Sequence, residues 1–179
     1  MDACGAAGRG QRGPHLDRER VGLGGARVRE CGDDHVADGR RALLDAAHNP
    51  AGARALAAWL ARTAAGARPP LVFAAAADKD VAGMIGVLAP VVGDIVVTAF
   101  TDPRALEADA LAVEVRRALA GDAGPRTVHV AATPADALDT AWRLSRDIVV
   151  AGSIFLLGEA YPLLGRPEPF ARDRVEPQS

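Results

Sequence analysis

The chain has 179 residues, of which 49% are hydrophobic and only 4% aromatic, and its formal net charge is -2. This length suits one domain with a hydrophobic core, and that core must be built from Val, Leu, Ile and Ala rather than from aromatic rings. The slightly negative charge argues against nucleic acid and anionic membranes as partners, because proteins that bind them carry basic surfaces.

Residues 1–40 form a first segment that is rich in Gly, Arg and Asp and shows no strand or helix period of apolar residues. It cannot bury enough apolar surface to offset the entropy of ordering it, so we expect it to be mostly disordered or poorly packed. It holds both cysteines, Cys4 and Cys31, which lack metal-ligand spacing and are too few for a disulfide scaffold.

The cellular location follows from what the sequence does not contain. The first residues have no apolar core of the kind that a signal peptide needs. The longest apolar run, residues 84–100, is interrupted by two glycines, a proline and an aspartate, so it is not expected to span a bilayer. We therefore expect a soluble, cytoplasmic protein that makes no membrane contact.

From Arg41 onward, short apolar runs alternate with segments of helical spacing, and Gly and Pro separate them. Strands are expected at residues 42–45, 71–75, 95–99, 127–131 and 148–151, and helices at 50–64, 81–88, 107–120, 134–145 and from 154 to Pro162, which ends or bends the last one. This alternation predicts an α/β domain over residues 41–170: a Rossmann-like wound, mostly parallel sheet with helices on both faces. Residues 171–179 are expected to be a loose tail.

The stretch from Leu43 to Pro50 predicts a ligand site. Asp45 ends the first predicted strand, and ligands bind at this end of the strands in α/β sheets. Its carboxylate can accept hydrogen bonds from ribose hydroxyls, or it can form an Asx turn with its own backbone. Asn49 and Pro50 open a helix, so we assign Asn49 mainly to N-capping and only secondarily to ligand contact.

His48 lies just before that helix, whose backbone N–H groups at residues 51–53 form an anion-attracting end. Its imidazole can donate a hydrogen bond to a phosphate oxygen, and Gly52 leaves room for a ligand to approach the backbone. The alternative is a histidine bonded to a neighbouring carbonyl group. The residues alone leave both open.

Lys79 and Ser153 are candidates for binding a substrate carboxylate. Lys79 follows a predicted strand and stands between Asp78 and Asp80, so it is either a point charge for an anion or a solvated loop residue. Ser153 follows Gly152 at the start of the last helix, where it can cap the helix, donate to a carboxylate, or do both. No cluster with metal-ligand spacing is present, so no metal site is expected.

The motifs resemble those of a known family. The segment from Asp45 to Pro50, Asp-Ala-Ala-His-Asn-Pro, is similar to the signature that opens the C-terminal domain of folylpolyglutamate synthases and dihydrofolate synthases in the Mur ligase superfamily. Blocks at 77–81, 102–106 and 152–159 are each similar to a family block and follow the family order. The ordered set covers roughly residues 41–170 and is more specific than any one block.

This resemblance implies a fold of the Mur ligase C-terminal type and an ATP-dependent ligase reaction. In that reaction a folate or dihydropteroate carboxylate becomes an acyl phosphate, which the amine of L-glutamate attacks. The resemblance implies that Asp45, His48 and Asn49 contact ATP, with His48 in the catalytic environment, and that Lys79 and Ser153 orient glutamate.

The resemblance implies an N-terminal ATPase domain that would hold the magnesium ion, and we expect this domain to be missing here. No G-x-x-x-x-G-K-[ST] phosphate-binding loop occurs in the sequence. A truncated gene or a reading-frame error would explain this, and it predicts that the DNA encodes a ligase N-terminus in another frame or just upstream. The chain alone is then expected to be inactive.

Two other functions remain to be weighed. One is a non-catalytic nucleotide- or amino-acid-binding module that docks onto a separate P-loop ATPase domain in trans. The other, a ligase for a cell-wall amino acid, is disfavoured because the blocks around Lys79 and Ser153 are both of the glutamate type.

Overall fold

The computed structural model describes residues 19–21, 27–29, 35–36, 39–121 and 126–165. The chain divides into two units, Met1–Glu30 and Cys31–Ser179. In the first unit, strands β1 (Glu19–Val21) and β2 (Arg27–Arg29) pair antiparallel. The expected disorder of residues 1–40 concerns mainly residues outside the described part and stays a prediction, as does the loose tail at 171–179.

The second unit is built on a six-stranded sheet with the order β3-β4-β8-β5-β6-β7. Its strands are β3 (His35–Val36), β4 (Arg40–Asp45), β5 (Leu71–Phe73), β6 (Ile95–Val97), β7 (Val128–Val130) and β8 (Asp147–Ala151). All neighbouring pairs are parallel except β3 and β4. The predicted parallel α/β sheet is therefore confirmed. The antiparallel edge strand β3 was not predicted, because two residues are too few to show a period.

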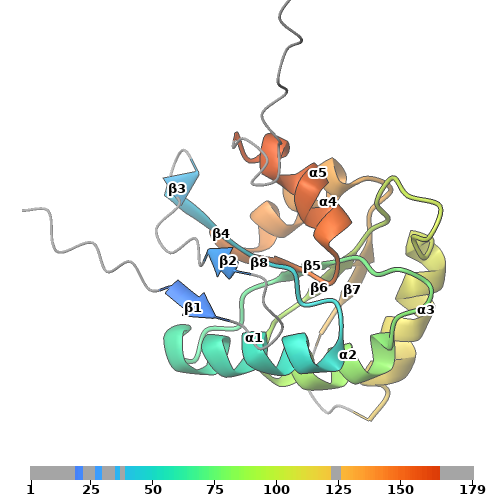
Figure 1. The fold of residues 1–179 in the computed structure, drawn as a ribbon, viewed down its shortest axis with the longest axis horizontal. Helices are drawn as coiled ribbons and strands as arrows, with labels where there is room; N and C mark the ends of the chain where they lie inside the picture. Colours follow the sequence, from blue (N-terminus) through green and yellow to red (C-terminus); the bar gives the residue numbers. More distant parts are fainter. Residues whose placement is uncertain (1–18, 22–26, 30–34, 37–38, 122–125, 166–179) are drawn as a thin grey trace, which may run out of the picture. The chain divides into compact units, whose positions relative to one another are not determined.

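The helices form one layer on each face of this sheet (Figure 1). They are α1 (Pro50–Thr63), α2 (Val81–Leu88), α3 (Ala108–Leu119), α4 (Pro134–Leu144) and α5 (Ile154–Leu163), with a short 3-10 turn at Ala89–Val91. The first three pack on one face, and α4 and α5 pack on the other. Pro162 lies in the last turn of α5, and the helix ends at Leu163, one residue after it.

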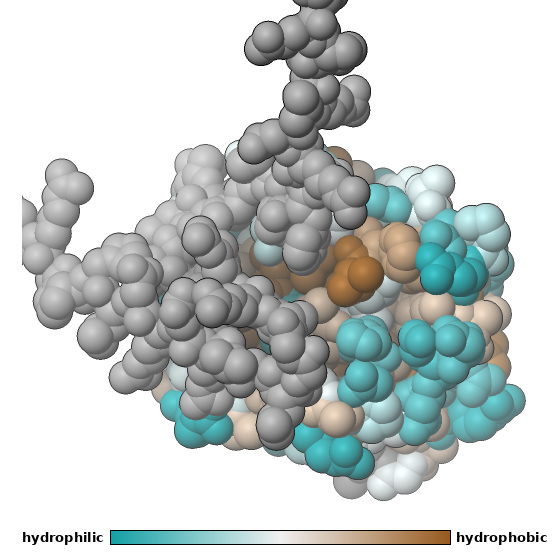
Figure 2. All heavy atoms as spheres, viewed as in Figure 1, coloured by the Kyte–Doolittle hydropathy of each residue, from teal (hydrophilic) through white to brown (hydrophobic). Residues whose placement is uncertain are grey.

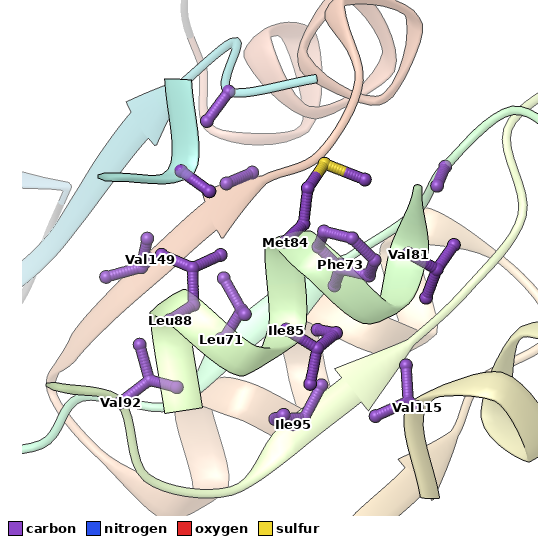
Figure 3. Close-up of a cluster of buried hydrophobic side chains, with 14 of the residues drawn as sticks. Leu71, Phe73, Val81, Met84, Ile85, Leu88, Val92, Ile95, Val115 and Val149 are labelled. Atoms are coloured by element: carbon purple, nitrogen blue, oxygen red, sulfur yellow. The ribbon is translucent and has the colours of Figure 1, made fainter. Parts of the chain in front are cut away.

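Alternation along the short strands divides the core into two clusters, because successive side chains of a strand point to opposite faces. Leu71 and Phe73 face α1, α2 and α3, whereas Val72 faces α4 and α5. Figure 3 shows the first cluster, in which Met84, Ile85 and Leu88 of α2 lie over the strands. On the opposite face, alanines of α4 and α5 let the helices approach the sheet closely.

On the coloured part of the face drawn in Figure 2, hydrophilic and apolar side chains are interspersed. Among the described residues, no helix has the length and apolar character needed to cross a membrane.

Candidate functional site

The carboxyl ends of three neighbouring strands bring together the loops that carry the candidate residues. Asp45 of β4 is in register with Ala151 of β8, which is in register with Phe73 of β5. Ser153 comes just after Ala151, and Lys79 lies in the loop that continues from Phe73. Since β4, β8 and β5 are adjacent and parallel, these loops leave the same side of the sheet, which we call the carboxyl edge. Ligands bind at this edge in α/β folds.

Asp45 forms the Asx turn that was weighed against a ligand role. Its Oδ1 accepts a hydrogen bond from the Ala47 backbone N–H at 2.9 Å. This bond fixes the direction in which the chain leaves β4 and holds the carboxylate at the carboxyl edge. Each carboxylate has about four acceptor positions, so this bond does not use the whole accepting capacity of Asp45.

His48 is exposed, and its Nδ1 lies 2.9 Å from the carbonyl oxygen of Ala46. Because a carbonyl oxygen only accepts, Nδ1 carries the proton in this bond. The other ring nitrogen, Nε2, lies 3.4 Å from Nδ2 of Asn49 and accepts there when the ring is neutral. His48 can therefore donate to a phosphate through Nε2 only when the ring carries both protons.

Asn49 caps α1. Its Oδ1 accepts from the Gly52 N–H at 2.8 Å, and its carbonyl oxygen accepts from the Ala53 N–H at 2.9 Å. The backbone N–H groups of Gly52 and Ala53 are therefore already engaged, and the expectation that they are available to an anion is wrong. A Cβ on Gly52 would lie 3.1 Å from Cα of Ala47, so this glycine lets the loop pack closely against the helix, and its role in ligand approach stays a prediction.

Lys79 is engaged by its neighbour in the sequence. Its Nζ lies 3.0 Å from Oδ2 of Asp78, with the lysine side chain 34% and the aspartate side chain 72% exposed. The hydrogen bond from Lys79 lowers the pKa of Asp78. Asp80, on the other side, accepts from the Gly83 N–H at 2.8 Å and caps α2. The ammonium group is therefore at the carboxyl edge with an exchangeable carboxylate partner.

Ser153 is buried, at 5% exposure, and its Oγ accepts from the Phe155 N–H at 3.1 Å as the N-cap of α5. Gly152, just before it, has φ +110°, and a Cβ there would lie 2.6 Å from the Phe73 ring and collide with the Ala74 carbonyl oxygen. Only glycine fits this position, and its lack of a side chain lets the turn before Ser153 pass close to the end of β5.

A loop that was not among the candidates connects these parts. Residues 100–106, after β6, bond to the Lys79 loop through Ala77 N–H to Arg104 O at 2.8 Å and Leu106 N–H to Ala75 O at 2.9 Å. The same loop contacts α5, because the Thr101 N–H donates to Oε1 of Glu159 at 2.6 Å. The loops after β5 and β6 and the start of α5 are thus tied to one another.

Arg104 and Phe155 are the side chains that sequence reasoning missed. The guanidinium carbon of Arg104 lies 4.8 Å from the centre of the Phe155 ring, which stacks on Phe100 at 5.5 Å. Arg104 also donates to both carboxylate oxygens of Asp102, at 2.9 and 3.1 Å, and these bonds lower the pKa of Asp102 to about 2. The only sequence signal was the Asp-Pro-Arg turn at 102–104.

An apolar groove lies beside the carboxyl edge, between the start of α4 and α5. Its lining includes Pro134, Ile154, Phe155, Pro162 and Leu163. None of the five candidate residues lines it. Within the described ranges, no group of three His, Cys, Asp or Glu side chains is placed to hold a metal ion.

The fold and the carboxyl edge define a class of protein. The chain belongs to the Mur ligase, glutamate ligase domain family, whose family model matches residues 30–154. The matched range includes part of the segment before Arg41, and the domain boundary expected at Arg41 stays a prediction.

The most informative relatives are folate-related ligases. The chain is 36% identical, over 168 residues, to the dihydrofolate synthase/folylpolyglutamate synthase of Mycobacterium tuberculosis. The match covers 84% of this chain and 34% of that protein. The chain thus spans about a third of the length of this curated relative.

Solved structures agree with this result. The folylpolyglutamate synthase of Mycobacterium tuberculosis, complexed with ADP and AMPPCP, superposes with a TM-score of 0.63 at 37% identity, over 70% of this chain and 30% of that one. The folylpolyglutamate synthase of Thermotoga maritima superposes with a TM-score of 0.61 at 26% identity, over 72% of this chain and 28% of that one. A bifunctional folylpolyglutamate synthase/dihydrofolate synthase with Mn, AMPPNP and L-glutamate bound superposes with a TM-score of 0.53 at 26% identity. The match covers 70% of this chain and 30% of that one.

Proposed function

We propose that this chain is the ATP- and glutamate-contacting domain of an ATP-dependent ligase that joins L-glutamate to a folate or dihydropteroate carboxylate. The observation that carries the proposal is the alignment of Asp45, Ala151 and Phe73, which places the loops of Asp45, Ser153 and Lys79 on one edge of the sheet. Relatives solved with adenine nucleotides, and one with L-glutamate, support the choice of ligands.

The residues of this edge can divide the work by their chemistry. Asp45 accepts hydrogen bonds from nucleotide hydroxyls, while a doubly protonated His48 donates to phosphate and Asn49 lies beside it. Lys79 exchanges its Asp78 partner for a glutamate carboxylate, and the Ser153 hydroxyl donates to the same substrate while its lone pair caps α5. ATP, when bound, supplies the phosphoryl group that activates the acceptor carboxylate.

Orientation is the contribution that these residues make to the rate. Holding glutamate by its carboxylate leaves its amine free to face the acceptor. Such positioning makes a bimolecular step effectively unimolecular and so lowers the entropic part of the activation barrier. The given sequence has no G-x-x-x-x-G-K-[ST] phosphate-binding loop, and we assign the binding of the γ-phosphate and of magnesium to another domain. We therefore expect the purified chain to release no phosphate in the presence of folate, ATP and glutamate. Measurable folate-dependent release would contradict this part of the proposal.

Binding to the isolated chain tests the site directly. In two-dimensional amide NMR spectra, ADP is expected to shift resonances of residues 45–52, whereas L-glutamate is expected to shift those of 77–80 and 152–155. D-glutamate is the matched control, because it has the same charge but places its amine differently. Shifts confined to other segments, or none at millimolar ligand, would refute the assignment.

A second candidate function is a non-catalytic binding module that docks onto a separate P-loop ATPase subunit. The apolar groove beside Ser153 favours it, since Ile154 and Leu163 are about half exposed there, at 50% and 52%. Mixing the chain with a P-loop ATPase domain separates the two functions. Restored ligase turnover supports the first, and complex formation without turnover supports the second.

A further inference from the structure

Four arginines gather at the end of the sheet opposite the carboxyl edge. Arg40 and Arg41 begin β4, Arg143 lies in the last turn of α4, and Arg146 precedes β8; all four are exposed. The Arg41 N–H donates to the Arg146 carbonyl oxygen at 2.8 Å, which joins the two strand ends. We call these four residues the arginine cluster.

The arginines of the cluster differ in their acidic neighbours. Arg41 donates from Nε and Nη2 to the two carboxylate oxygens of Asp147, at 2.7 and 2.6 Å, and lowers the pKa of Asp147. Asp139 lies one turn before Arg143 on α4. Among the described residues, neither Arg40 nor Arg143 is in an ion pair. Arg40 and Arg143 therefore keep their positive charges available for a partner.

The neighbours of Arg40 and Arg143 hold them in place. The guanidinium carbon of Arg40 lies 5.6 Å from the ring centre of Trp142, and Nη2 of Arg143 donates to Oγ1 of Thr140 at 3.0 Å. A cationic side chain at a helix C-terminus stabilises the helix dipole, which explains Arg143. It does not explain Arg40 and Arg41, because strand pairs have only small net dipoles.

The other edge has the opposite charge. Asp45 ends β4 at the carboxyl edge, and Asp78, Asp80 and Asp102 lie in loops there together with Lys79 and Arg104. The positive charges of Arg40 and Arg143 therefore attract acidic groups to their end of the sheet. Electrostatic complementarity of this kind raises association rates and selects acidic partners.

We propose that the arginine cluster is a docking surface for an acidic peptide segment with several successive carboxylates. Guanidinium groups match carboxylates with two parallel hydrogen bonds, and Arg41 already holds Asp147 in this way. Side chains on one face of an extended peptide repeat every ~6.6 Å, so one acidic segment presents several carboxylates along a single face. This inference does not depend on the proposed ligase function.

Trp142 supplies an optical readout, since it touches Arg40 and only one other tryptophan, Trp59, is present. In a Trp59→Phe background, hexa-L-glutamate is expected to change the Trp142 fluorescence saturably at low ionic strength. The binding is expected to weaken strongly above ~0.5 M salt, where charges are screened within a few ångströms.

Paired variants locate the surface. Arg40→Gln with Arg143→Gln is expected to weaken hexaglutamate binding about tenfold or more, equivalent to about 1.4 kcal/mol. Arg116→Gln with Arg117→Gln removes the same charge from exposed positions of α3 and is expected to change affinity less than about twofold. Arg40→Lys with Arg143→Lys, which keeps the charge, is expected to retain most of the binding.

Three results would overturn the proposal. Equal losses of hexaglutamate affinity in the two double Gln variants would mean that the peptide responds to the overall charge of the protein and not to a local site. A thymidine hexanucleotide that binds as tightly as hexaglutamate would mean that carboxylates are not preferred. An unchanged Trp142 signal, with binding detected by calorimetry, would place the peptide elsewhere.

Discussion

Replacing Gly152 by alanine tests the turn that positions Ser153. Gly152 has φ +110°, where an L side chain is strained by about 1–3 kcal/mol. The new Cβ would also collide with the Ala74 carbonyl oxygen and lie 2.6 Å from the Phe73 ring, which is fully buried and has no room to swing away. Overpacking of this kind costs about 1–3 kcal/mol. We therefore expect the free energy of unfolding to fall by about 2–6 kcal/mol.

Urea denaturation followed by circular dichroism measures this change. The midpoint is expected to fall while the slope stays the same, since the exposed surface on unfolding does not change. Gly158→Ala is the matched control within α5, where a Cβ meets nothing within 4 Å and alanine should stabilise the helix by about 0.5–1 kcal/mol. If Gly152→Ala unfolds within about 0.5 kcal/mol of the parent chain, the steric reasoning is wrong.

Three further predictions concern the same loops. Asn49→Ala is expected to lower the free energy of unfolding by about 1 kcal/mol through loss of the α1 cap, and Asn49→Ser should restore most of it in urea titrations. Asp102 has a pKa of about 2 because Arg104 donates to it, so its contribution to stability is complete above the unfolded pKa near 3.8 and is lost as the pH falls through 2. Asp102→Asn should therefore flatten stability against pH between these values, and an unchanged acid limb would count against the ion pair. Lys79→Met is expected to abolish the glutamate-dependent NMR shifts and leave the urea midpoint nearly unchanged, since its pair with Asp78 is exposed.

The fold was predictable because local signals agreed with the tertiary structure. Asn49, Asp80, Thr133 and Ser153 each cap a helix where a capping residue follows a strand or turn, and β-branched runs such as Ile95–Val97 form the buried strands. Alternation of strand and helix leaves few topologies, because parallel crossovers are right-handed. The common edge of Asp45, Lys79 and Ser153 follows from that topology.

The details of the site were less predictable because they depend on side-chain geometry. The sequence left open whether Asp45 forms an Asx turn and whether His48 bonds a carbonyl group, and the structure contains both bonds. The stack of Arg104 on Phe155 joins residues far apart in the chain, so no local pattern could indicate it. Roles in ligand binding for all five candidate residues stay predictions.

An isolated antiparallel β-bridge pairs Ala76 with Ala105 at the carboxyl edge. Because it fastens the loop of Lys79 to the loop of Arg104, neither can change length without displacing the other. Related sequences are thus expected to differ here by single side-chain replacements, and insertions should be tolerated only where both loops change together.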